Sequence, residues 1–211
     1  AMKMFVYRIK FTADYYRKKT SDILYAAPIP LVSGTAATIQ NSATAENRGV
    51  ELALAYRNID HDFKYSIGGN IAFVQSEVTG LGKGGEPVLS GTVQFANAFA
   101  AKTDVGHPLA SFFGYVTDGI FQTQEEVEAA AFQNDATAPG DIRFKDLDGN
   151  GVIDIYDQTY IGHPTPEFMY GLTGDLEWKG FEMNLFFEGS QGNDIFKTFT
   201  RYDFTYVNRP S

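Results

Sequence analysis

Long runs in which apolar and polar residues alternate are the feature that most limits what this chain can fold into. From Phe5 to Tyr16 the odd-numbered positions are aromatic or aliphatic, including the small Ala13. The polar residues Arg8, Lys10, Thr12 and Asp14 alternate with them. A period of two predicts a β-strand with one apolar and one polar face. The same pattern predicts further strands at about 49–58, 63–74, 168–178 and 181–188.

The alternation also fixes which side chains share a face, because a slip of one residue would invert every side chain. The apolar sets are Phe5, Tyr7, Ile9 and Phe11; Val50, Leu52, Leu54 and Tyr56; Phe63, Tyr65, Ile67, Ile71 and Phe73; Phe168, Tyr170, Leu172, Leu176 and Trp178; and Phe181, Met183, Leu185 and Phe187. Short turns at 59–62 and 179–180 join neighbouring strands as hairpins. We therefore expect an all-β fold, an antiparallel meander.

Strand length and unequal connections point to a membrane. Strands of ten to twelve residues are long for a soluble sandwich and suit a tilted crossing of a bilayer. The other connections are long loops, about 18–48 and 75–166, and tight turns on one side with long loops on the other are typical of an outer-membrane barrel. Within the second loop, Thr123–Glu126 reads as a capping box that starts a short helix reaching Phe132. A water-soluble sheet with one buried face is the alternative.

Composition narrows the function classes. The net charge of −9 argues against nucleic acid as a partner, since phosphates require a basic surface. The chain has no cysteine, which excludes a disulfide scaffold, and no apolar run long enough for a membrane helix. An aromatic fraction of 15% beside a mean hydropathy of −0.21 fits strands that are apolar on one face only. Alternating barrel strands average out in hydropathy, so a membrane location stays open.

The segment 146–157 has the pattern of a twelve-residue calcium loop. Gly151 permits the sharp turn, Val152 offers its carbonyl, and Asp154 acts directly or through water. Asp157 stands where the usual ligand is a bidentate Glu, as in dockerin-type loops. The predicted ligands of structural calcium, or of magnesium, are Asp146, Asp148, Asn150, Val152, Asp154 and Asp157. A solvated turn without metal is the alternative.

Catalytic patterns are absent, and we expect no enzyme. His61, His107 and His163 are scattered and form no zinc-binding spacing. Ser111 and Ser190 lack the strand–turn–helix elbow of a serine hydrolase. Carboxylates are plentiful, but a pair at catalytic separation cannot be recognised from sequence.

Several motifs in one order resemble SusC/RagA-like TonB-linked outer-membrane transporters, over nearly the whole chain. The motifs are FTADYYRKKTSDIL, ENRGVELAL, LASFFGYVTDGIFQTQEEV, PGDIRFKDLDGNGVIDIYDQTYIGHPTPEFMYGL and WKGFEMNLFFEGSQGNDIF. The chain departs from the family at Ala43, where a glycine is usual in a turn after the first strand.

The resemblance implies a barrel of about twenty-two strands, closed by an N-terminal plug and paired outside the cell with a SusD-like lipoprotein. Such pairs import oligosaccharides or peptides with energy from TonB, in the outer membrane of Bacteroidetes-like Gram-negative bacteria. Residues 1–211 then form one partial barrel domain, cut from a longer protein, without the plug and without barrel closure. Five strands leave unpaired edges and cannot close in lipid. The competing hypothesis is a soluble calcium-stabilised extracellular binding module.

Overall fold

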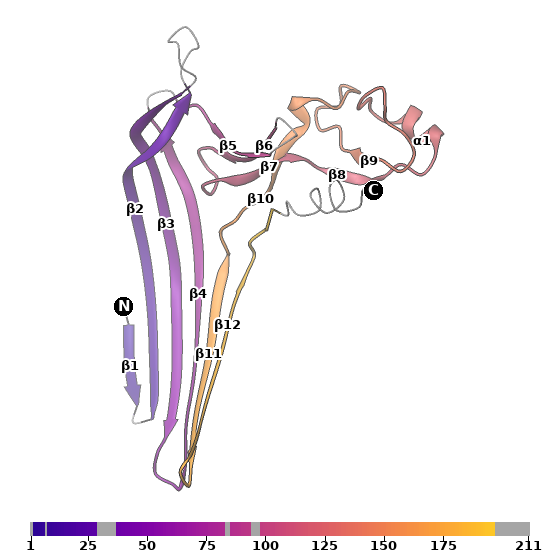
Figure 1. Cartoon of the computed structure of the whole chain (residues 1–211). Coiled ribbons are helices and arrows are strands. Elements are labelled where there is room, and N and C mark those ends of the chain that lie inside the picture. Colours follow the sequence, from indigo (N-terminus) through magenta and orange to yellow (C-terminus); the bar gives the residue numbers. More distant parts are fainter. Residues whose placement is uncertain (1, 7, 29–36, 83–84, 94–97, 197–211) are drawn as a thin grey trace, which may run out of the picture. The chain divides into compact units, whose positions relative to one another are not determined.

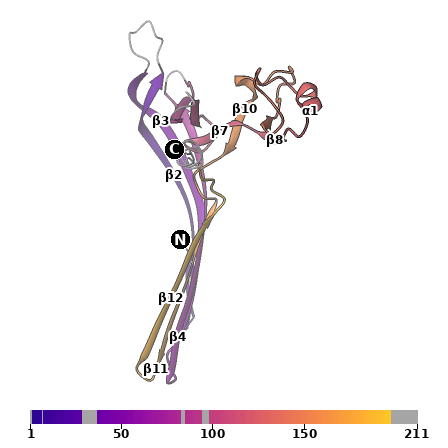
Figure 2. The ribbon, with the colours of Figure 1, turned by 45° about the vertical axis from the view of Figure 1, so that its right-hand side comes forward.

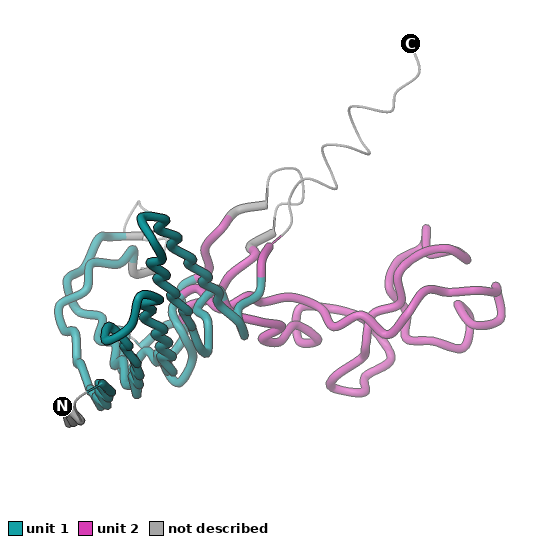
Figure 3. The backbone as a smooth tube through the Cα atoms, turned by 90° about the horizontal axis from the view of Figure 1, so that it is seen from below, with its two compact units in different colours: residues 1–88, 104–109, 164–194 teal, residues 89–103, 110–163, 195–211 magenta. Residues whose placement is uncertain are grey.

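The computed structural model describes residues 2–6, 8–28, 37–82, 85–93 and 98–196. The chain divides into two compact units, which Figure 3 distinguishes by colour. Unit 1 comprises residues 1–88, 104–109 and 164–194, and unit 2 comprises residues 89–103, 110–163 and 195–211. The sequence predicted a single domain with long loops, whereas most of the second long loop folds as a unit of its own.

Unit 1 is built on a six-stranded antiparallel sheet (Figure 1). The strands lie in the order β1 (Met2–Val6), β2 (Ile9–Pro28), β3 (Ala37–Asn58), β4 (Phe63–Leu81), β11 (Phe168–Trp178) and β12 (Phe181–Gln191). Each strand pairs with its neighbour in the chain, except that unit 2 is inserted between β4 and β11. The predicted antiparallel meander is therefore confirmed.

The register aligns the predicted faces across the sheet. One row runs through Phe11, Leu54, Gly69, Leu172 and Phe187, and the next rows on the same face carry Ile9, Tyr56, Ile67 and Leu185 and then Leu52, Ile71 and Tyr170. We call this the apolar face. The opposite, polar face carries Lys10, Glu51, Arg57, Lys64, Ser66, Asn70, Asp175, Glu177 and Asn184. Residues directly opposite in antiparallel strands lie on the same face, so the alternation holds across five strands.

The first predicted strand, 5–16, is wrong as one continuous element. Val6 pairs with Ile9, so the chain reverses between them and forms the hairpin β1–β2. The register sets Phe5 opposite Lys10, and Tyr7 lies outside the described residues. Because Val6 lies opposite Ile9, the two-residue turn shifts the phase of the alternation by one residue. The shift was concealed because Phe5 and Tyr7 continue the odd-numbered series of Ile9 and Phe11 across the turn.

Strands β2, β3 and β4 continue well beyond their predicted ends, and the loop predicted at 18–48 is mostly strand. Figures 1 and 2 show these three strands extending past the end of β11 and β12. Arg17, for example, lies opposite Arg48 and binds Glu46 through two of its guanidinium nitrogens, Nε at 2.7 Å and Nη2 at 2.8 Å. Charged residues that look like a loop in the sequence are thus paired strand residues, here joined by an ion pair across two strands.

A small core stabilises this extension. Ala43, Val78 and Leu81 are almost fully buried, and Ile23 and Tyr25 pack against them. Ala43, expected in a turn, lies within β3 opposite Leu81. Segment 104–109 covers the outer edge of β4, where the Val78 N–H donates to the His107 carbonyl and the Gly106 N–H donates to the Val78 carbonyl, each at 2.9 Å. An otherwise open edge is therefore satisfied within unit 1.

Unit 2 contains short elements where the sequence predicted a long loop. Its sheet has the order β10 (Gln158–Gly162), β7 (Ser111–Tyr115), β6 (Ala98–Thr103) and β5 (Val88–Val93), and β8 (Thr117–Ile120) pairs with β9 (Ile142–Phe144). The predicted helix is α1 (Gln124–Ala129), shorter than expected, and a 3₁₀ turn, η2, spans Ile155–Asp157. Among the described residues, no helix is both long and apolar enough to cross a membrane.

Candidate cation loop and sheet faces

The turn of the loop at 146–157 is held by side-chain oxygens that accept hydrogen bonds from the loop's own backbone N–H groups. The Asp146 carboxylate accepts from the N–H groups of Gly149 at 2.7 Å and Gly151 at 2.8 Å. The Asp148 carboxylate accepts a hydrogen bond from the Asn150 N–H at 3.0 Å, and the Asn150 side-chain oxygen accepts one from the Val152 N–H at 2.7 Å. Gly151 adopts φ +82°, a left-handed conformation that glycine takes without strain. The sharp turn predicted from the sequence is present.

Asp157, the last residue of the loop, is fully buried. One carboxylate oxygen accepts from the Leu147 N–H at 2.7 Å and the other from the Asp154 N–H at 2.8 Å. The Asp154 carboxylate in turn accepts from the Tyr156 N–H, which completes a reciprocal cap of η2. The N–H of Asp154, with those of Leu147 and Asp148, lowers the pKa of Asp157 against the opposing effect of burial. Asp157 therefore closes the loop as a carboxylate.

Three of the six predicted metal ligands come together. Oxygens of Asp146, Asp148 and Asp157 all lie within 4.8 Å of one another. The Asp154 carboxylate lies outside this cluster and caps η2. The Asn150 side chain donates to Asp148 and accepts from Val152. The loop therefore presents a converging group of carboxylates, while the side chains of Asn150 and Asp154 are engaged in holding the turn.

A contact that the sequence did not predict anchors the loop to the segment after α1. The Phe132 N–H donates to the Gly151 carbonyl and the Ile153 N–H donates to the Phe132 carbonyl, each at 2.8 Å. Phe132 and Val152 thus form an isolated parallel bridge. Backbone groups make this contact, so no side-chain pattern could have indicated it.

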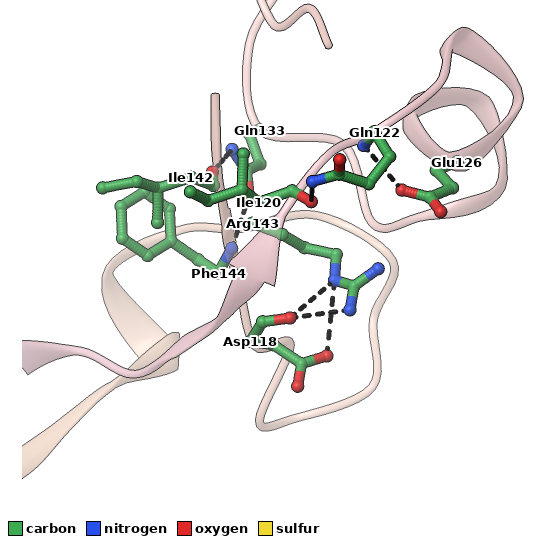
Figure 4. A network of polar contacts seen from close by, with 8 residues as sticks. All are labelled: Asp118, Ile120, Gln122, Glu126, Gln133, Ile142, Arg143 and Phe144. Atoms are coloured by element: carbon green, nitrogen blue, oxygen red, sulfur yellow. Dashed lines mark hydrogen bonds and ion pairs between the residues drawn. The ribbon is translucent and has the colours of Figure 1, made fainter. Parts of the chain in front are cut away.

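Polar side chains also tie the rest of this region together, as Figure 4 shows. The Gln133 amide donates to the Ile142 carbonyl at 3.0 Å and accepts from the Phe144 N–H at 2.7 Å, so it occupies the edge of β9 as a strand would. Arg143 donates to the Asp118 carbonyl at 2.6 and 3.0 Å and lies 3.4 Å from its carboxylate.

The start of α1 follows the predicted capping box in one half only. Thr123 accepts from the Glu126 N–H, as predicted, at 3.3 Å. The Glu126 carboxylate accepts from the N–H of Gln122, one residue before the cap, at 2.8 Å (Figure 4). The cap therefore satisfies one backbone donor of the first helical turn, the Glu126 N–H, and one just before the helix, the Gln122 N–H.

The two faces of the unit 1 sheet differ in chemistry over the rows that β2, β3 and β4 share with β11 and β12. On the apolar face, Leu54, Leu172 and Phe187 are more than half exposed, at 55%, 52% and 62%. On the polar face, Lys64 and Glu177 form an ion pair at 2.7 Å, and the Asn184 amide donates to Asp175 at 2.7 Å. Exposed apolar side chains in rows across several strands mark a surface that a non-aqueous environment or a partner covers.

Comparison with known proteins agrees with this architecture. Residues 2–209 match the family described as TonB dependent receptor-like, beta-barrel. The TonB-dependent receptor P3 of Formosa agariphila is 36% identical over 91% of this chain and 19% of its own length. The TonB-dependent receptor SusC of Bacteroides thetaiotaomicron is 26% identical over 93% of this chain and 18% of its own length.

The fold is also similar to that of a solved transporter. The structure of the RagAB peptide transporter superposes on this chain with a TM-score of 0.67 at 21% sequence identity. The match covers 88% of this chain and 19% of the transporter chain. The chain thus spans about a fifth of the length of these relatives. The relatives are receptors and transporters rather than enzymes, in agreement with the prediction from the sequence. The chain belongs to the TonB-dependent receptor-like β-barrel family.

Proposed function

We propose that the chain forms part of the wall of an outer-membrane transporter that imports nutrients with energy supplied through TonB. The observation that carries the proposal is the register of unit 1, which puts apolar rows on one face and charged rows on the other. A bilayer crossing needs about 9–11 tilted residues per strand, and β11 and β12 have 11 residues each. The apolar face then meets lipid and the polar face lines the lumen.

We base the proposed partner and substrates on the relatives named SusC and RagAB peptide transporter. In the proposed complex, a SusD-like lipoprotein covers the barrel from outside. Oligosaccharides and peptides are the proposed substrates, and a plug elsewhere in the parent protein contacts TonB. We propose that the long insertion between β4 and β11 is extracellular, because outer-membrane barrels carry their long loops on that side.

Uptake by whole cells tests this function. A strain that lacks the parent gene, and the same strain complemented with it, are given fluorescent oligosaccharides or oligopeptides. We expect one ligand class to accumulate only in the complemented strain, and a protonophore to abolish the accumulation. Recovery of the parent protein in the soluble fraction would instead favour a soluble calcium-stabilised extracellular module.

We further propose that the loop at 146–157 binds calcium as a structural ion. Three carboxylates converge there, and two carboxylates about 4 Å apart repel by roughly 4 kcal/mol at an effective dielectric constant of 20. A divalent cation reverses the sign of that interaction. Ligands that are all oxygens favour calcium or magnesium over zinc, and calcium accepts irregular geometry more readily than magnesium does. The ion would order the loop and, through the Phe132 bridge, the segment after α1.

Calorimetric titration of the parent protein with calcium tests the ion. We expect binding in the native protein and its loss in Asp148→Ala. Asp135→Ala, an exposed carboxylate outside the loop, is the matched control and should bind like the native protein. Equal binding by all three proteins, or by none, would show that the loop is a polar turn without metal, and a magnesium titration separates the two ions.

A further inference from the structure

The apolar face of unit 1 has a defined height. On β4 its rows run from that of Phe63, which holds Trp178, to that of Phe73, which holds Phe168. Ten residue steps along a strand cover about 33 Å, and a strand tilt of about 40° reduces this to about 25 Å across a membrane. Outer-membrane barrels have an apolar band of about that height, with aromatic residues at both borders. The row of Phe73 lies toward the end of the sheet from which β4 continues into the proposed extracellular insertion, so it marks the outer border of the band.

Two rows that contain charged residues follow directly beyond this border, on the part of β2, β3 and β4 that extends past β11 and β12 (Figure 1). The first row is Arg17–Arg48–Gln75, and the second is Lys19–Glu46–Glu77. The pairing from Tyr15 to Lys19 contains no bulge, so steps of two residues keep both rows on the face that carries Tyr15 and Phe73. We call these two rows the charged border.

The first row of the charged border brings two positive charges together. Arg17 and Arg48 lie directly opposite each other, and like charges in that position repel. The Glu46 carboxylate binds Arg17 and compensates its charge. Arg48 donates through Nε to the neutral Gln75 side-chain oxygen at 2.9 Å and forms no ion pair with another described residue. The Arg48 charge is therefore left without a carboxylate of its own.

Lys19 adds a second such charge in the next row. Its side chain is exposed, and within the described part of the chain it has no ion pair either. Lys19 lies diagonally across from Arg48, a separation of about 7–8 Å, so the two long side chains can reach a common anion. Of the two carboxylates in the row, Glu46 is bound by Arg17, and Glu77 lies one strand further away on β4.

We propose that the charged border binds the headgroup phosphate of a phosphorylated glycolipid in the outer leaflet, through Arg48 and Lys19. The inference rests on the proposed function, in which the apolar face meets lipid and the insertion is extracellular. Arginine offers a planar fork of N–H donors to a phosphate, and lysine a compact positive charge. Tyr15 and Phe73, at 67% and 46% exposure in the last apolar row, lie directly below these charges and would contact the acyl chains. An amphiphile fits both parts of this surface, whereas a soluble anion would use only the charged part.

Native mass spectrometry of the parent protein in detergent, titrated with lipid A, tests this site. We expect the double variant Lys19→Gln/Arg48→Gln to bind lipid A at least tenfold more weakly than the native protein, and Lys19→Arg/Arg48→Lys to retain binding. Arg57→Gln is the matched control, because Arg57 is an exposed arginine on the polar face of the same strand β3, and this variant should bind like the native protein. Dephosphorylated lipid A should bind the native protein as weakly as lipid A binds the double variant. Circular dichroism checks that each variant keeps its strands.

The same titrations separate a glycolipid from other anions and this proposal from the proposed function. Equal affinity of the native protein and the double variant for lipid A would overturn the glycolipid site, as would equal affinity of the native protein for phosphatidylglycerol. Displacement of lipid A by inorganic phosphate at matched ionic strength would show a site for free phosphate instead. These outcomes in a parent protein recovered from the membrane would overturn the charged border's role alone, whereas a parent protein recovered in the soluble fraction would overturn the barrel wall itself.

Discussion

Unit 1 and unit 2 are stabilised by different means. Unit 1 is a sheet with few buried side chains, in which backbone pairing sets the geometry and the two faces are chemically opposed. Unit 2 has short strands and a six-residue helix, and its loops are held by carboxylates and amides that accept from backbone N–H groups. Unit 1 therefore depends on the medium around its faces, and unit 2 on individual polar side chains.

The difference predicts different sensitivities to mutation. In unit 1, the surrounding lipid should decide whether a side chain is tolerated, because the sheet itself buries little. In unit 2, the loss of one hydrogen-bond acceptor should lower local stability even in water, because a buried N–H group without a partner destabilises the folded state. The following predictions test this contrast, from the largest expected effect to the smallest.

The largest effect is expected for Leu54→Arg in the parent protein. Leu54 lies on the apolar face between Phe11 and Gly69, and an arginine there would face lipid at a cost of roughly 2–4 kcal/mol near the bilayer midplane. Lys64→Ala on the polar face removes only an exposed ion pair, worth about 0–1 kcal/mol. Reversible urea unfolding in lipid vesicles measures the loss of unfolding free energy in both variants. Equal losses on the two faces would indicate a sheet buried on both sides.

In unit 2, Asp157→Asn should loosen the cation loop. Asn offers one acceptor where Asp157 uses two oxygens, so the N–H of Leu147 or Asp154 loses its partner. We expect roughly 5- to 100-fold faster hydrogen exchange at these amides, read by mass spectrometry in calcium-free buffer. Asp135→Asn is the control and should leave their exchange unchanged.

The same carboxylate makes the loop sensitive to acid. The pKa of Asp157 is lowered in the folded protein, so its contribution to stability is complete above the unfolded value of about 3.9. That contribution is lost as the pH falls through the lowered folded-state pKa. The rate of hydrogen exchange at the Leu147 amide, corrected for its intrinsic pH dependence, should therefore rise below about pH 4 in the native protein. In Asp157→Asn the corrected rate should not change with pH. A native profile that is also flat would contradict the assigned role.

A fourth test concerns close approach in unit 1. Gly49 lies opposite Tyr16, and a Cβ at Gly49 would meet the Tyr16 ring at 2.7 Å and the Phe73 carbonyl at 2.5 Å. Gly49→Ala should therefore cost about 1–3 kcal/mol through overpacking. Gly174→Ala is the matched control, since its nearest neighbour, Leu185 Cβ, lies at 3.9 Å. Similar unfolding free energies for the two variants would show that the Tyr16 ring and the Phe73 carbonyl both move aside at little cost.

The contrast between the units also explains what the sequence could reveal. The faces of unit 1 were predictable because a period of two survives in the residue order, as in Phe181, Met183, Leu185 and Phe187. The reversal at Val6–Ile9 shifts the phase of that period by one residue, and it was missed because Phe5 and Tyr7 continue the odd-numbered series of Ile9 and Phe11 across the turn. The extension of β2 and β3 was missed because charged residues such as Arg17 and Glu46 resemble a loop. In unit 2 the Asp-rich turn was predictable from local spacing, whereas the Phe132 bridge joins backbone groups across 20 residues and has no side-chain signature.

The smallest effect is expected at the β11–β12 hairpin. Lys179 and Gly180 both adopt positive φ, +47° and +84°, which is the combination of a type I′ turn, where Asn–Gly is preferred. Lysine is strained there, but its ammonium lies 5.4 Å from the centre of the Trp178 ring, a contact worth about 0.5–1 kcal/mol.

Replacing Lys179 loses that contact and changes the strain, so two variants are needed to separate the effects. Lys179→Gln loses the cation and keeps a side chain that disfavours positive φ, whereas Lys179→Asn loses the cation and relieves the strain. We expect the Lys179→Asn variant to be more stable than Lys179→Gln by about 0.5–1 kcal/mol in vesicle unfolding. The stability of Lys179→Asn should lie close to that of the native protein, because the relief of backbone strain nearly cancels the loss of the ring contact. If Asn and Gln were equally stable, the turn would not select for left-handed conformation, and the ring contact alone would account for Lys179.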